Sequence, residues 1–176
     1  MKVFRGMPDA TQDPNGYRRS QNQLRNWKAD GADVTFRPLK YRYQLDASGR
    51  PIMDVNGKKK TPVGPPEEKG IDLLIGLTAL LCAQDPSVDL VILASHDSDM
   101  SPVVETVHDL NAATPNRVAA IETASWFIPR DKGSGNAGFQ SQIRPRRDAR
   151  GNSRSVWNTR LDKNDHMLTL DTRAYR

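Results

Sequence analysis

The spacing of apolar residues predicts that helices and strands alternate along most of the chain. In the first third, apolar stretches at 2–5 and 34–45 predict strands, and the second is interrupted or ended near Pro38. Between them, residues 15–29 repeat apolar side chains at helical spacing, with basic residues elsewhere on the surface. The connecting segments are rich in Pro, Asp and Gly, which favours loops.

The most strongly helical pattern covers residues 67–84. Its apolar positions recur at helical spacing: Ile71, Leu74, Ile75, Thr78, Leu81 and Cys82. Glu67 and Glu68 are expected near the positive end of the helix, where acidic side chains are favoured. The segment therefore predicts an amphipathic helix that begins with two glutamates.

A strand, a helix and another strand are expected next, in close succession. Residues 89–95 form a continuous apolar run, which is typical of a strand covered on both faces of a parallel sheet. Residues 101–112 fit a helix with Ser101 as N-cap and Pro102 in its first turn. Residues 117–124 fit a further strand. This order predicts an α/β fold with a mostly parallel, doubly wound sheet.

The length of the chain suits one domain, which is expected at residues 1–128. A β-hairpin insertion is expected within it at about 43–64, because Ser48–Gly49 and Asn56–Gly57 are turn signals.

The C-terminal part is expected to be less regular. Residues 129–155 are rich in Gly, Ser and Arg and contain few core residues, which predicts a flexible basic loop. Residues 156–176 are expected to form a tail that docks on the domain through four apolar side chains: Trp157, Leu161, Met167 and Leu168.

The formal net charge of +5 conceals three segments of opposite sign. Residues 1–60 carry 13 Lys or Arg against 6 acidic residues, and residues 110–176 carry 12 against 6. Residues 61–109 carry one, Lys69, against 9 acidic residues. A metal-dependent enzyme acting on a polyanion would need an acidic centre between basic flanks. A solvated acidic helix face with basic tails fits the same charges, and both interpretations stay open at this point.

Cysteine content and hydropathy indicate in which cellular compartment the protein is expected. The single cysteine, Cys82, excludes an intrachain disulfide and a cysteine-based zinc cluster, and its apolar surroundings favour a buried structural thiol. The first residues do not resemble a signal peptide, and no apolar stretch is long enough to cross a bilayer. We therefore expect a cytoplasmic protein without a membrane partner.

The stretch LVILASHDSDMSP carries the main candidate chemistry, because it leads a predicted strand directly into Asp97 and Asp99. Paired carboxylates repel each other unless a positive charge lies between them. Ligands of open parallel sheets bind at the carboxyl ends of strands, and Asp72, in the first turn of the preceding helix, is expected near the same edge. Three converging carboxylates would hold Mg²⁺ or Mn²⁺, which could activate water for phosphodiester cleavage.

Two aspartates after a strand are also compatible with other proteins. Glycosyltransferases use D-x-D to hold Mn²⁺ and a nucleotide sugar. Adhesion modules of the von Willebrand type use D-x-S-x-S, and this chain has Asp99 where that motif has Ser. The pair could instead cap the following helix without any ligand.

A longer pattern closely resembles the NYN family of PIN-like ribonucleases. The matching blocks are EKGIDLLIGLTALL and DLVILASHDSDMSPVVETV, and the specific part of the resemblance covers residues 67–124. Lys69, Gly70 and Asp72 match the first block, and Ser95, Asp97, Ser98 and Asp99 match the second. His96 stands where Gly is usual, and Met100 where Phe is usual. The resemblance implies a PIN-like three-layer sandwich with a mostly parallel central sheet.

The resemblance also implies an activity, which is metal-dependent endoribonuclease cleavage of RNA. Asp72, Asp97 and Asp99 would be the metal ligands, with Mg²⁺ or Mn²⁺ as the cofactor. Ser95 and Ser98 would orient carboxylates or a metal-bound water. Lys69 would contact the scissile phosphate or pair with Glu67 or Glu68. Basic side chains would bind the RNA backbone: Arg37, Lys40, Arg42, Arg144, Arg146 and Arg147. A solubilising tail is the alternative for these arginines.

The resemblance leaves one family element unmatched. Family members usually begin with a central strand bearing a further aspartate in a D-G-x-N pattern, and no such strand precedes Met1. Three explanations stay open: the recorded start is too late, the domain is a degraded relative, or a partner supplies the strand. An unpaired position in the sheet would also favour a homodimer. The alternative function is therefore a catalytically impaired RNA-binding or protein-interaction module. A nucleotide-sugar transferase is disfavoured, because no region is large enough for an acceptor domain.

Overall fold

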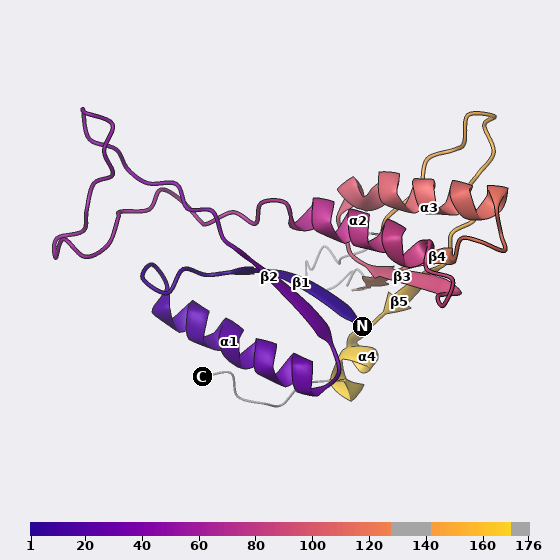
Figure 1. The fold of residues 1–176 in the computed structure, drawn as a ribbon, viewed down its shortest axis with the longest axis horizontal. Coiled ribbons are helices and arrows are strands. Elements are labelled where there is room, and N and C mark those ends of the chain that lie inside the picture. Colours follow the sequence, from indigo (N-terminus) through magenta and orange to yellow (C-terminus); the bar gives the residue numbers. More distant parts are fainter. Residues whose placement is uncertain (128–141, 170–176) are drawn as a thin grey trace, which may run out of the picture. The chain divides into compact units, whose positions relative to one another are not determined.

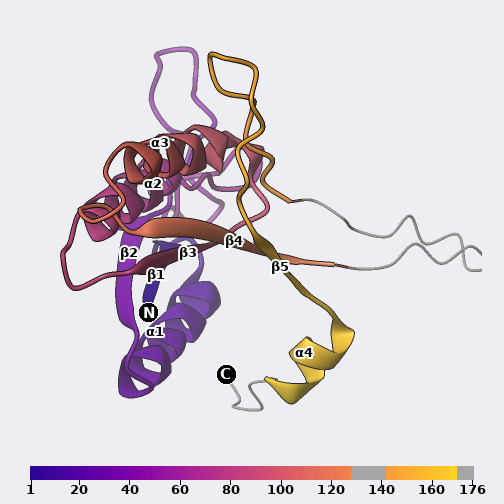
Figure 2. The ribbon, with the colours of Figure 1, turned by 90° about the vertical axis from the view of Figure 1, so that its right-hand side faces the viewer.

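The structure is a computed structural model that describes residues 1–127 and 142–169. It divides into two compact units, Met1–Leu74 and Ile75–Asp171, and each is described here by itself. The elements, drawn in Figure 1 and Figure 2, are β1 (Lys2–Met7), α1 (Pro14–Ala29), β2 (Asp33–Pro38), α2 (Ile71–Ala83), β3 (Leu90–Ala94), the 3₁₀ helix η1 (Ser98–Met100), α3 (Ser101–Ala113), β4 (Ala120–Trp126), β5 (Asn158–Leu161) and α4 (Lys163–Leu168).

In the first unit, β1 and β2 pair in parallel and α1 connects them, as the sequence predicts. α1 begins where Asp13 accepts a hydrogen bond from the backbone N–H of Gly16 at 2.8 Å, with Pro14 in the first turn. A Cβ on Gly16 would come within 2.0 Å of the Asp13 carboxylate. The sequence therefore fixes the start of α1 with a capping aspartate and a glycine that leaves room for it.

Residues 40–67 form a forked arm in the first unit (Figure 1). The stem is held by antiparallel bridges between Lys40 and Glu67 and between Tyr43 and Pro62. Beyond the stem the chain makes two small hairpins, one closed by the bridge of Leu45 with Pro51 and the other by that of Met53 with Lys60. The single hairpin expected at 43–64 is therefore a fork with two tips.

The branch point of the forked arm is closed by a ring of backbone hydrogen bonds. The N–H of Gln44 donates to Thr61 O, that of Thr61 to Ile52 O, and that of Ile52 to Gln44 O, at 2.8–2.9 Å. Both predicted turn signals lie at the tips, where Gly49 has φ +79° and Gly57 has φ +64°. These positive φ angles favour glycine, so each tip is fixed by its own sequence.

In the second unit, β3, β4 and β5 form a parallel sheet in that order. The core beneath α3 contains fully buried Val104 and Val107, packed with Leu93, Ile121 and Ile143. An α/β fold with parallel strands is therefore confirmed, but the described strands form two small sheets and not one. Among the described residues β3 pairs only with β4, so it lies at an edge of its sheet.

The last sheet strand and the last helix belong to the predicted C-terminal tail. β5 docks through its backbone ladder with β4 and through Asn158, whose Oδ1 accepts from Thr123 Oγ1 at 2.9 Å. Three of the side chains expected to dock are largely exposed instead: Trp157 by 68%, Met167 by 59% and Leu168 by 85%. Docking here depends on hydrogen bonding more than on burial of these apolar groups.

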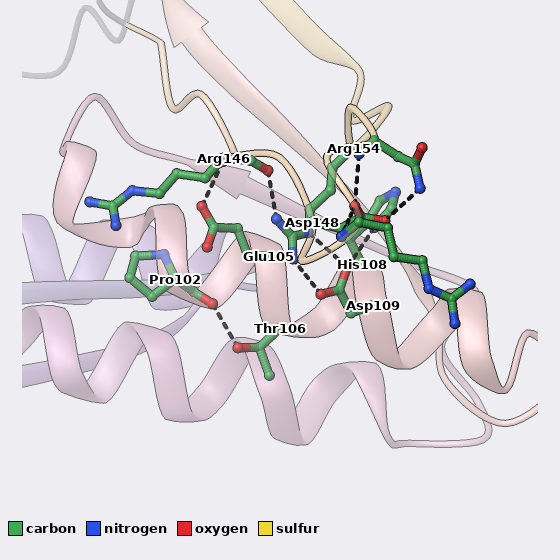
Figure 3. Close-up of polar contacts among 10 residues, drawn as sticks. Pro102, Glu105, Thr106, His108, Asp109, Arg146, Asp148 and Arg154 are labelled. Atoms are coloured by element: carbon green, nitrogen blue, oxygen red, sulfur yellow. Dashed lines mark hydrogen bonds and ion pairs between the residues drawn. The ribbon is translucent and has the colours of Figure 1, made fainter.

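Residues 142–157 precede β5 and are named here the strap, because they are tied to α3 (Figure 3). The guanidinium of Arg154 donates to both carboxylate oxygens of Asp109 at 2.6 and 2.7 Å, and to the carbonyl of Arg146 at 2.6 Å. Glu105 accepts from the backbone N–H of Arg146 at 2.7 Å, and Ile143 is only 2% exposed. The described part of the expected flexible loop is thus held in place, while 128–141 lie outside the described residues.

Three predicted local details differ in the structure. α2 begins at Ile71 and not at residue 67, because Gly70 has φ +74° and Glu67 belongs to the forked arm. Ser101 is the first residue of α3 and not its N-cap. Cys82 is half-buried.

The apolar run of β3 is not covered on both faces. Leu90 is 40% exposed and Ile92 is 59% exposed, whereas Leu93 on the opposite face is buried in the core.

None of the helices in the described part of the chain is both long and apolar enough to cross a membrane.

The ion pair between Asp109 and Arg154 predicts a pH-dependent contribution to stability. The hydrogen bonds from Arg154 lower the pKa of Asp109 from 3.8 to about 2. Because the unfolded chain takes up this proton first, the stabilisation is present above pH 3.8 and is lost as the pH falls toward 2. Asp109 is 49% exposed, so Asp109→Asn should lower the free energy of unfolding at pH 7 by only about 1 kcal/mol.

Urea unfolding at several pH values measures this difference. The difference in free energy of unfolding between wild type and Asp109→Asn should disappear as the pH falls below 3.8. Asp89→Asn, which removes an exposed carboxylate from the same unit, is the matched control and should show no such difference. A difference for Asp109→Asn that stays constant with pH would contradict an electrostatic origin.

Candidate active site

The loop after β3 carries Asp97 and Asp99 at the carboxyl end of the strand, where the sequence predicts them. Asp97 is exposed and is the N-cap of η1, because its Oδ1 accepts from the backbone N–H of Asp99 at 2.8 Å. The N–H of Asp97 in turn donates to Ser95 Oγ at 3.1 Å. Ser95 therefore positions the backbone of Asp97, and one carboxylate oxygen of Asp97 is used to cap the helical turn.

Asp99 differs from Asp97 in the use of its carboxylate. It lies in the first turn of η1 and is exposed, as is Ser98 beside it. Among the described residues, no hydrogen bond or ion pair engages the carboxylate of Asp99. The loop therefore carries two different carboxylates. That of Asp99 has both oxygens open to solvent, and that of Asp97 uses one oxygen to accept a backbone hydrogen bond.

His96 has a role that the sequence did not indicate. The backbone N–H of Trp126, at the end of β4, donates to His96 Nε2 at 2.7 Å. Nε2 can accept this bond only without a proton, which assigns the proton of the neutral ring to Nδ1. His96 thus fastens the loop that carries both aspartates to the neighbouring strand, as a structural residue.

Asp72 lies in the first unit, in the first turn of α2, and is exposed. Asp97 and Asp99 lie in the second unit, so the convergence of the three carboxylates remains a prediction. Within the described ranges, no three His, Cys, Asp or Glu side chains gather closely enough to hold a metal ion. Two exposed carboxylates are nevertheless a suitable partial set for Mg²⁺, which usually keeps several water ligands.

Lys69 is paired with Glu67, which was one of the two alternatives for it. Its Nζ lies 3.1 Å from Glu67 Oε2, and Arg42 forms an ion pair with the other carboxylate oxygen. Glu67 Oε2 is buried, and Lys69 is its nearest cation among the described residues. Lys69, followed by Arg42, lowers the pKa of Glu67. These three residues form an ion-pair cluster at the base of the forked arm.

The residues predicted to grip RNA are all exposed: Arg37, Lys40, Arg42, Arg144, Arg146 and Arg147. The first three lie in the first unit, and Arg42 is partly neutralised by Glu67. The last three lie in the strap, where Arg147 also donates to the carbonyl of Gly151 at 2.7 Å. Their guanidinium groups face solvent, so a polyanion can reach them.

A hollow of about 450 Å³ lies at the other end of the second unit. Its lining comes from the segments that precede β3 and β4, including Asp85, Asp89 and Arg117. Ligands of parallel sheets bind at the carboxyl ends of the strands, so this hollow is distinct from the candidate site at Asp97.

Comparisons with protein-family models, with curated proteins and with solved structures found no match to this chain.

The capping geometry of Asp97 predicts different effects for two substitutions. Asp97→Asn keeps an oxygen that can accept from the N–H of Asp99, so its free energy of unfolding should stay close to that of the wild type. Asp97→Ala removes the cap and should lower it by about 1 kcal/mol. Urea unfolding of both variants at pH 7 measures the difference. Equal losses in the two variants would show that the charge of Asp97, and not its cap, stabilises the fold.

Proposed function

We propose that the chain is a metal-dependent ribonuclease of the NYN and PIN-like type, which hydrolyses phosphodiester bonds of RNA. The observation that carries this proposal is the pair of exposed carboxylates, Asp97 and Asp99, at the carboxyl end of the parallel strand β3. The residue pattern shared with that family over 67–124 supports it as well.

Each residue of the proposed site has a distinct task. Asp99 and the free oxygen of Asp97 would hold Mg²⁺ or Mn²⁺, with Asp72 as a third ligand. The bound metal would supply a more acidic water and stabilise the negative charge that develops on the phosphate. Ser95 and His96 hold the loop in place through backbone hydrogen bonds. The proposed hydrolysis is a direct attack by water, and it needs no nucleophilic side chain.

The PIN-like fold and its unfilled central position belong to the same proposal. The open edge of β3 supports it, because all described pairing of that strand is with β4. A further strand at this edge would complete the proposed sheet, and a second copy of the chain or a partner protein is one proposed source of it.

A non-catalytic RNA-binding or protein-interaction module is the second candidate. It is favoured by the use of Asp97 as a helix cap, which needs no metal. This candidate predicts RNA binding that weakens with salt, without cleavage.

Cleavage of a mixed RNA pool by the purified chain, in Mn²⁺ or in EDTA, separates the two candidates. The ribonuclease predicts cleavage only with Mn²⁺, and a loss of roughly 100-fold or more in Asp97→Asn. Asp97→Asn is the appropriate variant because it retains the capping oxygen, so lost activity reports the missing charge.

Asp85→Asn is the matched control for this experiment. Asp85 accepts from the N–H of Ser87 at 2.9 Å in a similar turn, at the opposite end of β3. The control should cleave like the wild type. A folded wild-type chain that does not cleave, or cleavage that survives Asp97→Asn, would contradict the proposed site.

A further inference from the structure

The forked arm concentrates positive charge on a small exposed segment. Residues 40–63 contain six Lys or Arg and two Asp, which gives a net charge of +4. The two tips carry three cations that did not stand out in the sequence: Arg50, Lys58 and Lys60. All three are exposed. The arm therefore attracts anions, and its tips are accessible to them.

The two aspartates of the arm form bonds with its backbone and not with its cations. Asp46 Oδ1 accepts from the N–H and the hydroxyl of Ser48 at 2.8 and 2.7 Å, and from the N–H of Arg50 at 3.0 Å. Asp54 Oδ1 accepts from the N–H groups of Lys58 and Lys59 at 2.8 and 3.2 Å. These bonds lower the pKa of both carboxyls, chiefly through the Ser48 hydroxyl for Asp46 and the Lys58 N–H for Asp54.

The acids thus build the turns, and the basic side chains stay available. Among the described residues, the side chains of Arg50 and Lys58 have no partner, since only their backbone N–H groups donate to the aspartates. Arg42 differs, because Glu67 neutralises it at the base of the arm. The free cations therefore lie at the tips and not along the stem.

Aromatic contacts stiffen the stem behind the tips. The rings of Tyr41 and Tyr43 are stacked, with centroids 6.4 Å apart and planes inclined by 14°. Lys60 Nζ lies 5.3 Å from the ring centroid of Tyr43, and Tyr41 Oη accepts from the N–H of Asp9 at 3.2 Å. Together with the bonded branch point, these contacts hold the backbone of the arm in place before any partner arrives, while the side chains of Arg50 and Lys58 stay free to adjust.

We propose that the forked arm binds the phosphate backbone of RNA through Arg50, Lys58 and Lys60 at its two tips. This inference rests on the proposed function for the choice of RNA among polyanions. Contacts from flexible, exposed cations to phosphates are independent of base sequence and confer salt-dependent affinity. The arm would therefore hold RNA without selecting its sequence. An anionic membrane surface is the competing partner, because Val55 is fully exposed at one tip.

Fluorescence anisotropy with a labelled single-stranded RNA, in EDTA and between roughly 50 and 200 mM KCl, tests this role. The triple variant Arg50→Ala, Lys58→Ala, Lys60→Ala should bind more weakly than the wild type. The slope of log K against log salt should become shallower by about 2, since each phosphate contact on a single strand contributes roughly 0.7. The turns should survive, because the aspartates accept from backbone N–H groups.

A second triple variant controls for net charge alone. Arg18→Ala, Arg19→Ala and Lys28→Ala remove three exposed cations from α1, in the same unit. The control should keep nearly the wild-type salt slope. Equal slopes in wild type and arm variant, or equal effects of the two triple variants, would overturn the proposal. Binding of the wild type to phosphatidylserine vesicles, lost in the arm variant while RNA binding is kept, would overturn it in favour of a membrane.

If the triple variant of the arm does not fold, the single variants Arg50→Ala and Lys58→Ala give the test, since neither side chain forms a hydrogen bond or ion pair among the described residues. Each should reduce the salt slope by roughly 0.7. Unchanged slopes in both single variants would overturn the proposal. The assay needs no metal and no cleavage, so the arm and the catalytic site are tested separately. If the arm variant binds RNA more weakly and the wild type shows no Mn²⁺-dependent cleavage, the arm's role in RNA binding is supported and the nuclease is refuted.

Discussion

Hydrogen bonding along β4 is the constraint on which the second unit depends. This strand pairs in parallel with β3 on one side and with β5 on the other. Its buried hydroxyls, Thr123 and Ser125, both donate to Asn158 of β5, so their burial leaves no polar group unsatisfied. At its end, the N–H of Trp126 donates to His96 Nε2. The loop that presents the candidate carboxylates is therefore positioned by the same strand that holds the sheet together.

Aspartate has a recurrent structural use in this chain, and this affects how Asp97 is interpreted. At many turns and helix starts a carboxylate accepts from a backbone N–H two to four residues ahead: Asp9, Asp13, Asp46, Asp54, Asp85, Asp97, Asp148 and Asp162. Capping alone therefore does not distinguish Asp97 from aspartates for which no metal is proposed. What distinguishes the site is Asp99, an exposed carboxylate without such a bond at the end of a parallel strand.

The sequence predicted the elements that local chemistry determines. The strands at 2–5 and 117–124 and the helix at 15–29 appear within a few residues of their predicted ends, because periodicity, capping and proline act locally. The start of α2 was wrong because Glu67 pairs across the forked arm with Lys40, a contact 27 residues away that no helical pattern contains.

Contacts between residues distant in sequence also explain what could not be predicted in the C-terminal part and in the candidate site. Arg154 stands in a polar segment, and only its distant partner Asp109 turns that segment into a strap. The position of Asp97 and Asp99 followed from the apolar run before them. The hydrogen bond to His96 could not be predicted, since it depends on how β3 and β4 pair.

Charge separation would assign the proposed RNA binding and the proposed cleavage to different parts of the chain. Residues 61–109 carry nine acidic residues against one lysine, so this segment repels RNA until a cation is bound. Residues 40–63 of the forked arm carry a net charge of +4 and would attract RNA without a metal. If both proposals hold, affinity comes mainly from the arm, and metal at Asp97 and Asp99 offsets a local repulsion. Removing the charge of Asp97 would then weaken cleavage without weakening binding, because the two depend on charges of opposite sign.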